Sequence, residues 1–539
     1  MRLVLLTSAG NQGFIFASNR LREAVGASEI VRTVTTDWVR DACAAVSETP
    51  GQRAVVLRAS SGGALVLADD GRGGADAAAD LTWRVTSAAL ARAPGLDVFG
   101  SSVAINGSLP TREEVGRVFA AAGRRQASRP AAATRFGRLP VVAACSSTDL
   151  PAAVWRSDAP ADGRGRPLPG EDPVPLSAEA RAKRAARPAA DRRMRTLLGP
   201  AFPLVDIDDF FDVVEWVGVV HADGNGLGGV FQRAGELLAD ARAVAKLSER
   251  VQAAADVAFR AAALAVPVGG RGAPLVPLVV GGDDLTVLVD GAAALPFARA
   301  YLDGFGAATA RDELIRTVTG GRGLTAAAGV AVVKPHFPFS SAYGLAAQLC
   351  RNAKDTIAGV GDASAAAGVG LHGVDVHVLF DNVVTSLPAL RERLRVPARE
   401  GSAGSVMLHE RPFFLPAPGA ELPAHARHRH IDAVLARARA VQGRAGGRAN
   451  GDAVSRSQLH GLREDVYADP GRAQRRFADL WRRSAPGGED RAVLTLLAGA
   501  PGDPPSLFRP VDGDGGQSTA LVDAVELADL AAAWTGGAS

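Results

Sequence analysis

Two adjacent carboxylates are the first residues of this sequence whose type and spacing could do chemistry. Residues 279–290 read VVGGDDLTVLVD, so Asp283 and Asp284 follow a glycine pair inside an otherwise apolar stretch. Burying carboxylates without a counter-charge is strongly unfavourable. We therefore expect a cation beside this turn.

A third carboxylate, Asp223, follows another apolar run, in the segment HADGNG (221–226). Three carboxylates that lie together cannot all stay ionised alone, whereas oxygen-preferring Mg²⁺ or Mn²⁺ ions relieve their repulsion. Two such ions, about 4 Å apart, form the clamp that polymerases use. The sequence thus predicts Asp223, Asp283 and Asp284 as catalytic metal ligands, with Gly224 as a further metal ligand.

Glycines and polar side chains around these aspartates are candidates for holding a nucleotide. Gly281 and Gly282 allow close approach of the backbone, and turn N–H groups can bind phosphate oxygens. Asn225 follows the first aspartate by two residues, and Lys354 lies in CRNAKD (350–355). We expect Lys354 to reach a triphosphate; the alternative is a solvated surface lysine.

The periodicity of the apolar residues predicts the elements that position these groups. Strand-like and helix-like patterns alternate in the ferredoxin-like order, strand–helix–strand–strand–helix–strand. The expected elements are a strand and turn at 215–228, a helix at 231–265, a hairpin at 273–290, a helix at 292–314 and a strand at 324–333. In this fold the first strand lies beside the hairpin, which would bring the three aspartates together.

The N-terminal residues repeat the same order of elements. The expected elements are a strand and turn at 3–16, helix to about residue 47, a hairpin at 53–70, a helix at 75–93 and a strand at 96–105. Such an internal duplication indicates two domains of one kind. Aligning the turns places SAGN (8–11) opposite ADGN (222–225), and SGGAL (61–65) opposite GGDD (281–284).

This alignment predicts that only the second copy is catalytic. Ala9 stands opposite Asp223, while Ala64 and Leu65 stand opposite the aspartate pair. The acids are therefore not required for the fold.

The first copy keeps a glycine turn of its own, formed by Ser61, Gly62 and Gly63. We predict that this turn faces the second copy and holds an acceptor nucleotide; the alternative is that the first copy only completes the core.

The predicted fold class is α+β, with two ferredoxin-like domains of the palm or nucleotide-cyclase kind, a helical connector and a helical C-terminal domain. The predicted domains are a degenerate first copy at 1–108, a connector at 109–200, a catalytic copy at 201–385 and a helical domain at 386–539.

Composition limits the other possibilities. The 539 residues carry a net charge of only +3, which indicates no strong nucleic-acid or membrane field. Three cysteines without a CxxC pair indicate a reducing, cytoplasmic compartment and no disulfide framework. Neither a signal peptide nor an apolar run long enough to span a membrane is expected.

Other motifs receive weaker interpretations. GNGLGG (224–229) matches a dinucleotide-binding turn, but that fold needs a short helix where one long helix is expected. HARHRH (425–430) is interpreted as a solvated face rather than a metal or RNA patch. DGDGGQSTALVD (512–523) lacks the residues of a calcium loop and is interpreted as a flexible loop.

The motifs together resemble a known family. VGVVHADGNGLGGVF, LVVGGDDLTVLV and VKPHFPFSSAYGLAAQLCRNAKD resemble the palm domain of the polymerase-like large subunit of type III CRISPR effector complexes, and more distantly GGDEF diguanylate cyclases. The N-terminal SAGNQGFIFASNRLREAVGASEIVR resembles the first, inactive palm of that family.

The resemblance implies two palms that face each other, ATP as the substrate and a nucleotidyltransferase that makes cyclic or linear oligoadenylates in antiviral defence. It also implies other effector subunits and guide RNA as partners. The knuckle-like VAACSSTDLPA (142–152) has only Cys145, so no zinc is expected. We expect a stand-alone or smaller relative without the HD nuclease. A catalytically silent scaffold subunit and a GTP-using dinucleotide cyclase remain alternatives.

Overall fold

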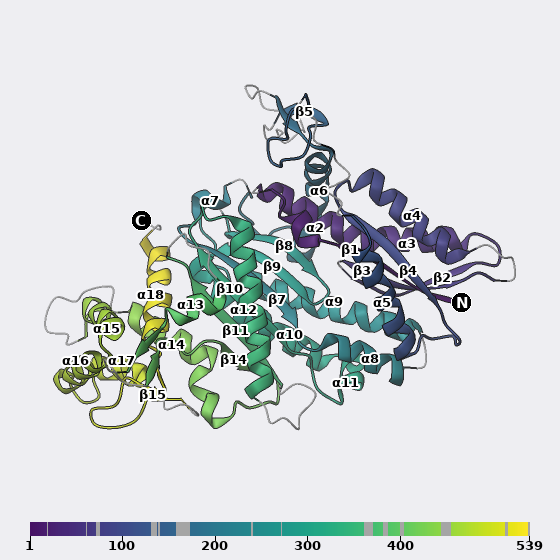
Figure 1. Ribbon diagram of the computed structural model, residues 1–539. Coiled ribbons are helices and arrows are strands. Elements are labelled where there is room, and N and C mark those ends of the chain that lie inside the picture. The colour runs from purple at the N-terminus through teal and green to yellow at the C-terminus, as the bar shows by residue number, and fades with distance from the viewer. Residues whose placement is uncertain are drawn as a thin grey trace.

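The computed structural model of the chain contains several sheets packed with helices, a mixed α+β architecture (Figure 1). The structure describes residues 1–18, 20–60, 62–71, 76–130, 137, 141–157, 173–207, 209–238, 241–270, 272–360, 370–380, 386–398, 404–443, 454–511 and 516–536. Within this part of the chain, no helix is long and apolar enough to cross a membrane.

The first sheet has four antiparallel strands in the order β2-β3-β1-β4. Their bounds are Arg2–Ala9 for β1, Arg53–Ser60 for β2, Gly63–Asp69 for β3 and Asp97–Ala104 for β4. Strands β1 and β3 are central because their residues are apolar and buried on both faces. This order confirms the element order predicted for the N-terminal copy.

Helices cover both faces of the first sheet. One face packs against helices of the copy itself, which are α1 (Asn11–Ile15), α2 (Leu21–Thr35), α3 (Asp37–Ser47) and α4 (Ala77–Arg92). The other face packs against α5 (Arg112–Ala127), whose Val118 contacts the cluster around Leu3 and Phe99. The packing of the first copy thus continues beyond residue 108, into the predicted connector.

The second sheet has six strands in the order β14-β11-β10-β7-β9-β8. Their bounds are Val217–Gly224 for β7, Leu275–Gly281 for β8, Asp284–Asp290 for β9, Ala326–Val333 for β10, Leu371–Val378 for β11 and Phe413–Pro416 for β14. The part β8-β9-β7-β10 repeats the order of the first sheet, as predicted. The sequence prediction missed the two added strands, of which β14 lies beyond residue 385.

The helices of the second copy differ from the prediction in one respect: the single helix expected at 231–265 is wrong. Two helices, α8 (Leu227–Leu237) and α9 (Ala241–Leu264), replace it, and Leu238 between them has an extended backbone with φ −98° and ψ 117°. No glycine or proline marks this break, so the end of α8 is set by packing. Ala234 and Leu247 are both buried in the same core.

The sheet topology excludes the dinucleotide-binding alternative. That unit requires a strand, a helix and a second strand paired parallel to the first. Here β7 pairs antiparallel with both β9 and β10, and β8, the next strand along the chain, pairs only with β9.

The remaining helices of the second copy lie on both faces of its sheet. They are α7 (Phe210–Val213), α10 (Gly291–Arg311), α11 (Glu313–Thr319) and α12 (Phe339–Val360). The connector contributes a hairpin, β5 (Val154–Ser157) with β6 (Pro173–Leu176), and the long helix α6 (Ala178–Leu198).

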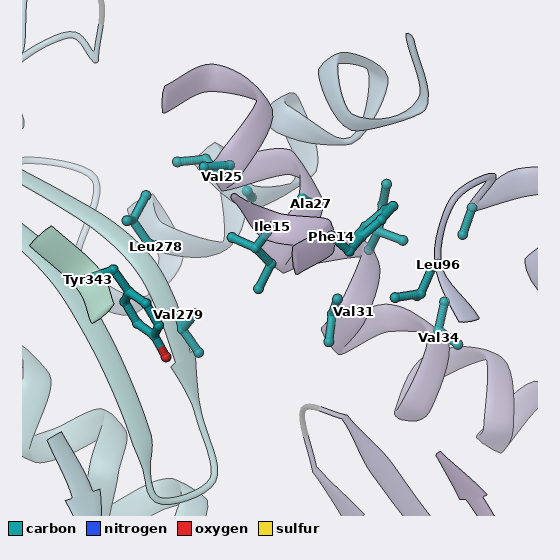
Figure 2. Packing of buried hydrophobic residues seen from close by; sticks show 14 of the residues in the cluster. Phe14, Ile15, Val25, Ala27, Val31, Val34, Leu96, Leu278, Val279 and Tyr343 are labelled. Atoms are coloured by element: carbon teal, nitrogen blue, oxygen red, sulfur yellow. The ribbon is translucent and has the colours of Figure 1, made fainter. Parts of the chain in front are cut away.

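The two copies share one hydrophobic core. Figure 2 shows side chains of the first copy facing side chains of the second, which are Ile15 and Val25 on one side and Leu278, Val279 and Tyr343 on the other. Strand β8 therefore packs against α2, and the hairpin that carries the aspartates lies beside the first copy.

The sequence predicted a purely helical C-terminal region, but the region also contains strands. Its helices are α13 (Leu387–Glu392), η2 (Ala424–Arg429), α14 (Ile431–Gln442), α15 (Arg456–Ala468), α16 (Pro470–Arg483), α17 (Glu489–Leu497) and α18 (Leu521–Gly536). It also contains a small sheet of β12 (Arg395–Pro397), β13 (Ser405–Met407), β16 (Gln517–Ser518) and β15 (Arg509–Pro510). These four strands and β14 show that the prediction of a helical domain at 386–539 is wrong.

Candidate active site

The three aspartates lie on neighbouring strands. Asp223 is the next-to-last residue of β7, and Ala222 before it pairs with Leu285 of β9. Asp284 is the first residue of β9, and Asp283 lies in the turn that joins β8 to β9. The antiparallel register therefore brings the three carboxylates together, as the sequence predicted.

The end of β7 lies directly against this turn. A Cβ atom added at Gly224 would lie 3.0 Å from the Cβ of Asp283 and would clash with Leu227. Glycine at this position thus lets the strand end and the turn approach closely. Gly282 in the turn has φ +65°, a left-handed conformation that also favours glycine.

The electrostatics of the site show that the carboxylates repel one another. Burial, followed by the nearby Asp223 carboxylate, raises the pKa of Asp283 to about 7. Burial and Asp223 also raise the pKa of Asp284 to about 7, and the ammonium of Lys354 opposes that rise. Near neutral pH, both groups hold a proton for part of the time.

Lys354 places a positive charge beside the three carboxylates. It reaches from α12 and donates from Nζ to Oδ2 of Asp223 and, at 2.8 Å, to the backbone oxygen of Gly224. Its side chain is 27% exposed, so the alternative of a solvated surface lysine is wrong.

Comparison with known proteins identifies the fold around these residues. Residues 216–358 match the family model of the second palm domain of Cas10/Cmr2. This part of the chain is a Cas10/Cmr2 palm domain. It carries all three aspartates and Lys354.

Solved structures of Csm1-Csm4 cassettes are similar to this chain. The cassette in complex with cA4 is 15% identical, with a TM-score of 0.51 over 98% of this chain and 70% of that chain. The apo cassette is 14% identical, with a TM-score of 0.41 over 66% of this chain and 53% of that chain, so this chain covers about half of its length. At these identities the likeness shows the fold alone. Comparison with curated proteins finds no match.

The sequence analysis missed a histidine beneath the aspartates of the palm. Nδ1 of His221 lies 3.2 Å from the hydroxyl of Thr286 and 3.5 Å from Oδ1 of Asp284. Burial lowers the pKa of His221, so the ring is neutral near pH 7. Its ring also packs against Tyr343, whose hydroxyl accepts a 3.1 Å hydrogen bond from Gln12 of the first copy. No motif in the sequence indicated this link.

The first copy faces the palm at its own glycine turn. A Cβ atom added at Gly282 would lie 3.6 Å from Cβ of Ser60, so the two turns are in contact. Ser61 lies outside the described residues. Gly62 donates its N–H to Thr35 at 3.1 Å, and Gly282 donates its N–H to Gln252. Both amides expected to bind phosphate are thus engaged by side chains.

The alignment of the two copies made from the turns is wrong by two residues. Ser60 pairs with Gly63 across the first hairpin as Gly281 pairs with Asp284 across the second, and both hairpins have a bulge at the same place. Gly62 and Gly63 therefore occupy the positions of Asp283 and Asp284, which had been aligned with Ala64 and Leu65. The glycine spacing misled because the glycine pair stands at the start of one turn, as Gly281 and Gly282, and at the end of the other, as Gly62 and Gly63.

Thr7, and not Ala9, corresponds to Asp223. Thr7 is level with Gly63 on the neighbouring strand. Asp223 follows Ala222, which pairs with Leu285, so it is level with Asp284 in the same way. With the corrected alignment the first copy still carries no carboxylate at any of the three positions, and catalysis by the second copy alone stays a prediction.

A cavity of about 570 Å³ separates the first copy from the palm beside these turns. Ser60 and Gly281 line it, and so do four arginines, which are Arg32, Arg40, Arg58 and Arg193. Burial lowers the pKa of Arg58 and the nearby Asp283 opposes that shift, while its Nε finds no hydrogen-bond partner among the described residues. No sequence motif indicated Arg58, which comes from the first copy.

The side-chain oxygens around the end of β7 and the start of β9 are of the kind that binds a divalent ion. Oδ1 of Asp284 and Oδ1 of Asn225 are buried, and neither has a hydrogen-bond partner in the part of the chain that the structure describes. No three described His, Cys, Asp or Glu side chains are arranged to hold a metal. Asp223 pairs with Lys354 instead, so a metal would have to take the place of this ammonium.

The raised pKa values of the pair predict how stability depends on pH. Between about pH 4 and 7 the folded chain keeps protons on Asp283 and Asp284 that the unfolded chain releases. Without metal, the free energy of unfolding should therefore fall as the pH rises through this window, with a slope of up to about 1.4 kcal/mol per pH unit for each proton. The Asp284 side chain is 45% exposed, so Asp283 should contribute more.

Urea unfolding from pH 5 to 8 in EDTA would measure this slope. Replacing Asp283 and Asp284 with alanine should flatten the profile, and Mg²⁺ should raise stability most at pH 8. The same slope in the double variant would show that other groups cause it.

Proposed function

We propose that this protein is a metal-dependent nucleotidyltransferase that condenses ATP into cyclic or linear oligoadenylates in CRISPR-type antiviral defence, acting in the cytoplasm. The observation that carries the proposal is the meeting of Asp223, Asp283 and Asp284 in a Cas10/Cmr2 palm, next to an arginine-lined cavity. The similarity to a Csm1-Csm4 cassette in complex with cA4 supports the adenylate product.

Asp223, Asp283 and Asp284 would hold Mg²⁺ or Mn²⁺, with the backbone oxygen of Gly224 as a further ligand. Two such ions, when bound, activate an attacking hydroxyl and stabilise the leaving pyrophosphate. Lys354 would then leave Asp223 and bind a phosphate oxygen, because the metal takes over the carboxylate. His221 would lie beneath the aspartates as a neutral side chain next to Asp284.

The first copy would hold the acceptor nucleotide. Arg58 offers a charged group without a partner for its Nε, and it lies within the electrostatic reach of Asp283. Phosphate bound near Arg58 would place an acceptor next to the turn of Gly281 and Gly282. Gly62 and Gly63 remain candidates for the same role, with Gly62 exchanging its bond to Thr35 for a phosphate.

Product analysis tests this function. The purified chain is incubated with each nucleoside triphosphate and Mg²⁺ or Mn²⁺, and the products are identified by mass spectrometry. We expect oligoadenylates from ATP. A cyclic dinucleotide from GTP would identify a GTP-using cyclase, and no product in the presence of other effector subunits and guide RNA would identify a silent scaffold.

Nucleotide binding should require a divalent metal. Titration calorimetry with a non-hydrolysable ATP analogue should give at least a tenfold weaker affinity in EDTA than in Mg²⁺. Ca²⁺ should support binding with little turnover, since its coordination is larger and looser than that of Mg²⁺. Full affinity in EDTA would contradict the metal clamp.

A further inference from the structure

A second, larger cavity lies in the C-terminal region. Its volume is about 1220 Å³, above the roughly 300–1,000 Å³ of most small-molecule pockets. Six arginines and three histidines line it, and Glu410 is the one acidic residue among the lining residues. Helix η2 lines the cavity and covers residues 425–429 of the HARHRH segment, for which a solvated face was expected.

Three of these arginines form ion pairs with buried carboxylates in the wall of the cavity. Arg411 is buried and pairs with Asp523 of α18 at 2.6 Å. Arg437 and Arg509 both pair with the buried Glu410, at 3.2 and 3.4 Å. Since these charges are compensated, they give the cavity its shape rather than a free positive charge.

Two arginines of η2 have no such compensation. No described carboxylate lies within 4.0 Å of Arg427 or Arg429. Arg427 is exposed; Arg429 is half-buried, donates from Nε to the backbone oxygen of Pro412 at 2.8 Å and lies over the ring of Phe414 at 4.5 Å. Two guanidinium groups that keep their charge thus line the cavity with hydrogen-bond donors to spare.

A buried histidine adds an unmet donor. Nδ1 of His409 accepts the backbone N–H of Arg411 at 3.2 Å, so in the neutral ring Nε2 carries the hydrogen. Burial lowers the pKa of His409 well below its usual range, which keeps the ring neutral. The side chain is only 8% exposed, and Nε2 has no acceptor among the described residues. A buried donor of this kind calls for an acceptor oxygen.

We propose that this cavity binds the phosphate backbone of a short single-stranded oligonucleotide, with Arg427 and Arg429 at its phosphates. Arginine forks match phosphate oxygens, and two free guanidiniums suit two phosphates of one strand. The volume favours a chain of nucleotides over one. None of the three aspartates of the palm lines this cavity, so the proposal does not depend on the proposed catalysis.

Fluorescence anisotropy with a labelled eight-nucleotide single-stranded RNA tests the proposal on the full chain. The titrations are made in EDTA, which removes metal-dependent binding at the palm. We expect Arg427→Gln with Arg429→Gln to raise the Kd at least tenfold. The slope of log Kd against log salt should fall by about 1.4, which is about 0.7 for each lost phosphate contact to a single strand.

The matched control is Arg475→Gln with Arg482→Gln, which removes two exposed arginines of α16 outside the cavity. An equal loss of affinity in this control would overturn the proposal, because net charge alone would then explain binding. If the η2 double variant is misfolded by circular dichroism, the single Arg427→Gln, at an exposed side chain, should still weaken binding about threefold; unchanged affinity there would overturn the site.

Competition identifies the ligand class. Unlabelled RNA of the same length should displace the probe at concentrations at which ATP and tripolyphosphate do not. Equal displacement by tripolyphosphate would replace the oligonucleotide with a free polyphosphate and so contradict the proposal.

Discussion

Replacing Asp283 and Asp284 with alanine should abolish nucleotide turnover, by about 10³-fold or more, and leave the protein folded. The loss follows because both ions of the clamp depend on these carboxylates, and removing even one strong electrostatic contact to a transition state costs about 10²–10³-fold. The fold should survive because the first copy builds the same hairpin with Gly62 and Gly63 at these positions.

The double variant should also be more stable than the natural chain at pH 8 in EDTA. Burial and mutual repulsion raise the pKa of both aspartates to about 7, so at pH 8 their ionised forms are the unfavourable ones. Turnover is measured from released pyrophosphate, and stability from thermal unfolding.

A suitable control is Asp303→Ala with Asp479→Ala, which removes two exposed carboxylates that are not part of the hairpin. Its turnover and melting temperature should stay near the natural values. Wild-type turnover in the Asp283→Ala, Asp284→Ala variant would show that these residues are not the metal ligands. A variant that fails to fold would show that the acids do support the hairpin.

The second large effect is expected from Lys354→Met. Turnover should fall about 10²-fold, because the lysine would no longer bind the triphosphate. Metal affinity should rise at the same time, since Mn²⁺ no longer has to displace an ammonium group from Asp223. A purely structural lysine would not produce these two changes in opposite directions.

The measurements are turnover at saturating ATP and Mn²⁺ binding by calorimetry without nucleotide. Lys334→Met is the matched control, because Lys334 also pairs with a carboxylate, Glu215 at 3.3 Å, and packs over Trp216. Weaker Mn²⁺ binding in Lys354→Met than in the natural chain would contradict the displacement model.

The sequence alone determined what local patterns encode. The alternation of apolar residues predicted both four-stranded orders, and the glycine–aspartate turn between two apolar strands predicted that Asp223 meets Asp283 and Asp284. These inferences succeed because strand periodicity and tight turns are properties of neighbouring residues. The Mg²⁺ or Mn²⁺ ions expected beside these buried carboxylates stay a prediction.

Local sequence patterns did not predict the exact ends of helices, the alignment of the two hairpins or the sheet that a short strand joins. The end of α8 at Leu238 has no local stop signal, and the two hairpins place their glycines differently, which shifted the alignment by two residues. A short apolar run such as residues 413–416 gives no sign of which sheet it joins. Packing settles each of these, because the energy of burying a segment depends on what lies opposite it.

Only the tertiary structure decided which charged groups belong to the site. The sequence pointed to Lys354 as a triphosphate contact, but only the structure shows that it pairs with Asp223, 131 residues away in the chain. Arg58 reaches the palm from the other copy, and Arg427 and Arg429 line a cavity although their segment reads as a solvated face. The sequence fixes the charge of such a side chain, but its partner is set by the distances between atoms that folding brings together, and the Coulomb energy depends on those distances.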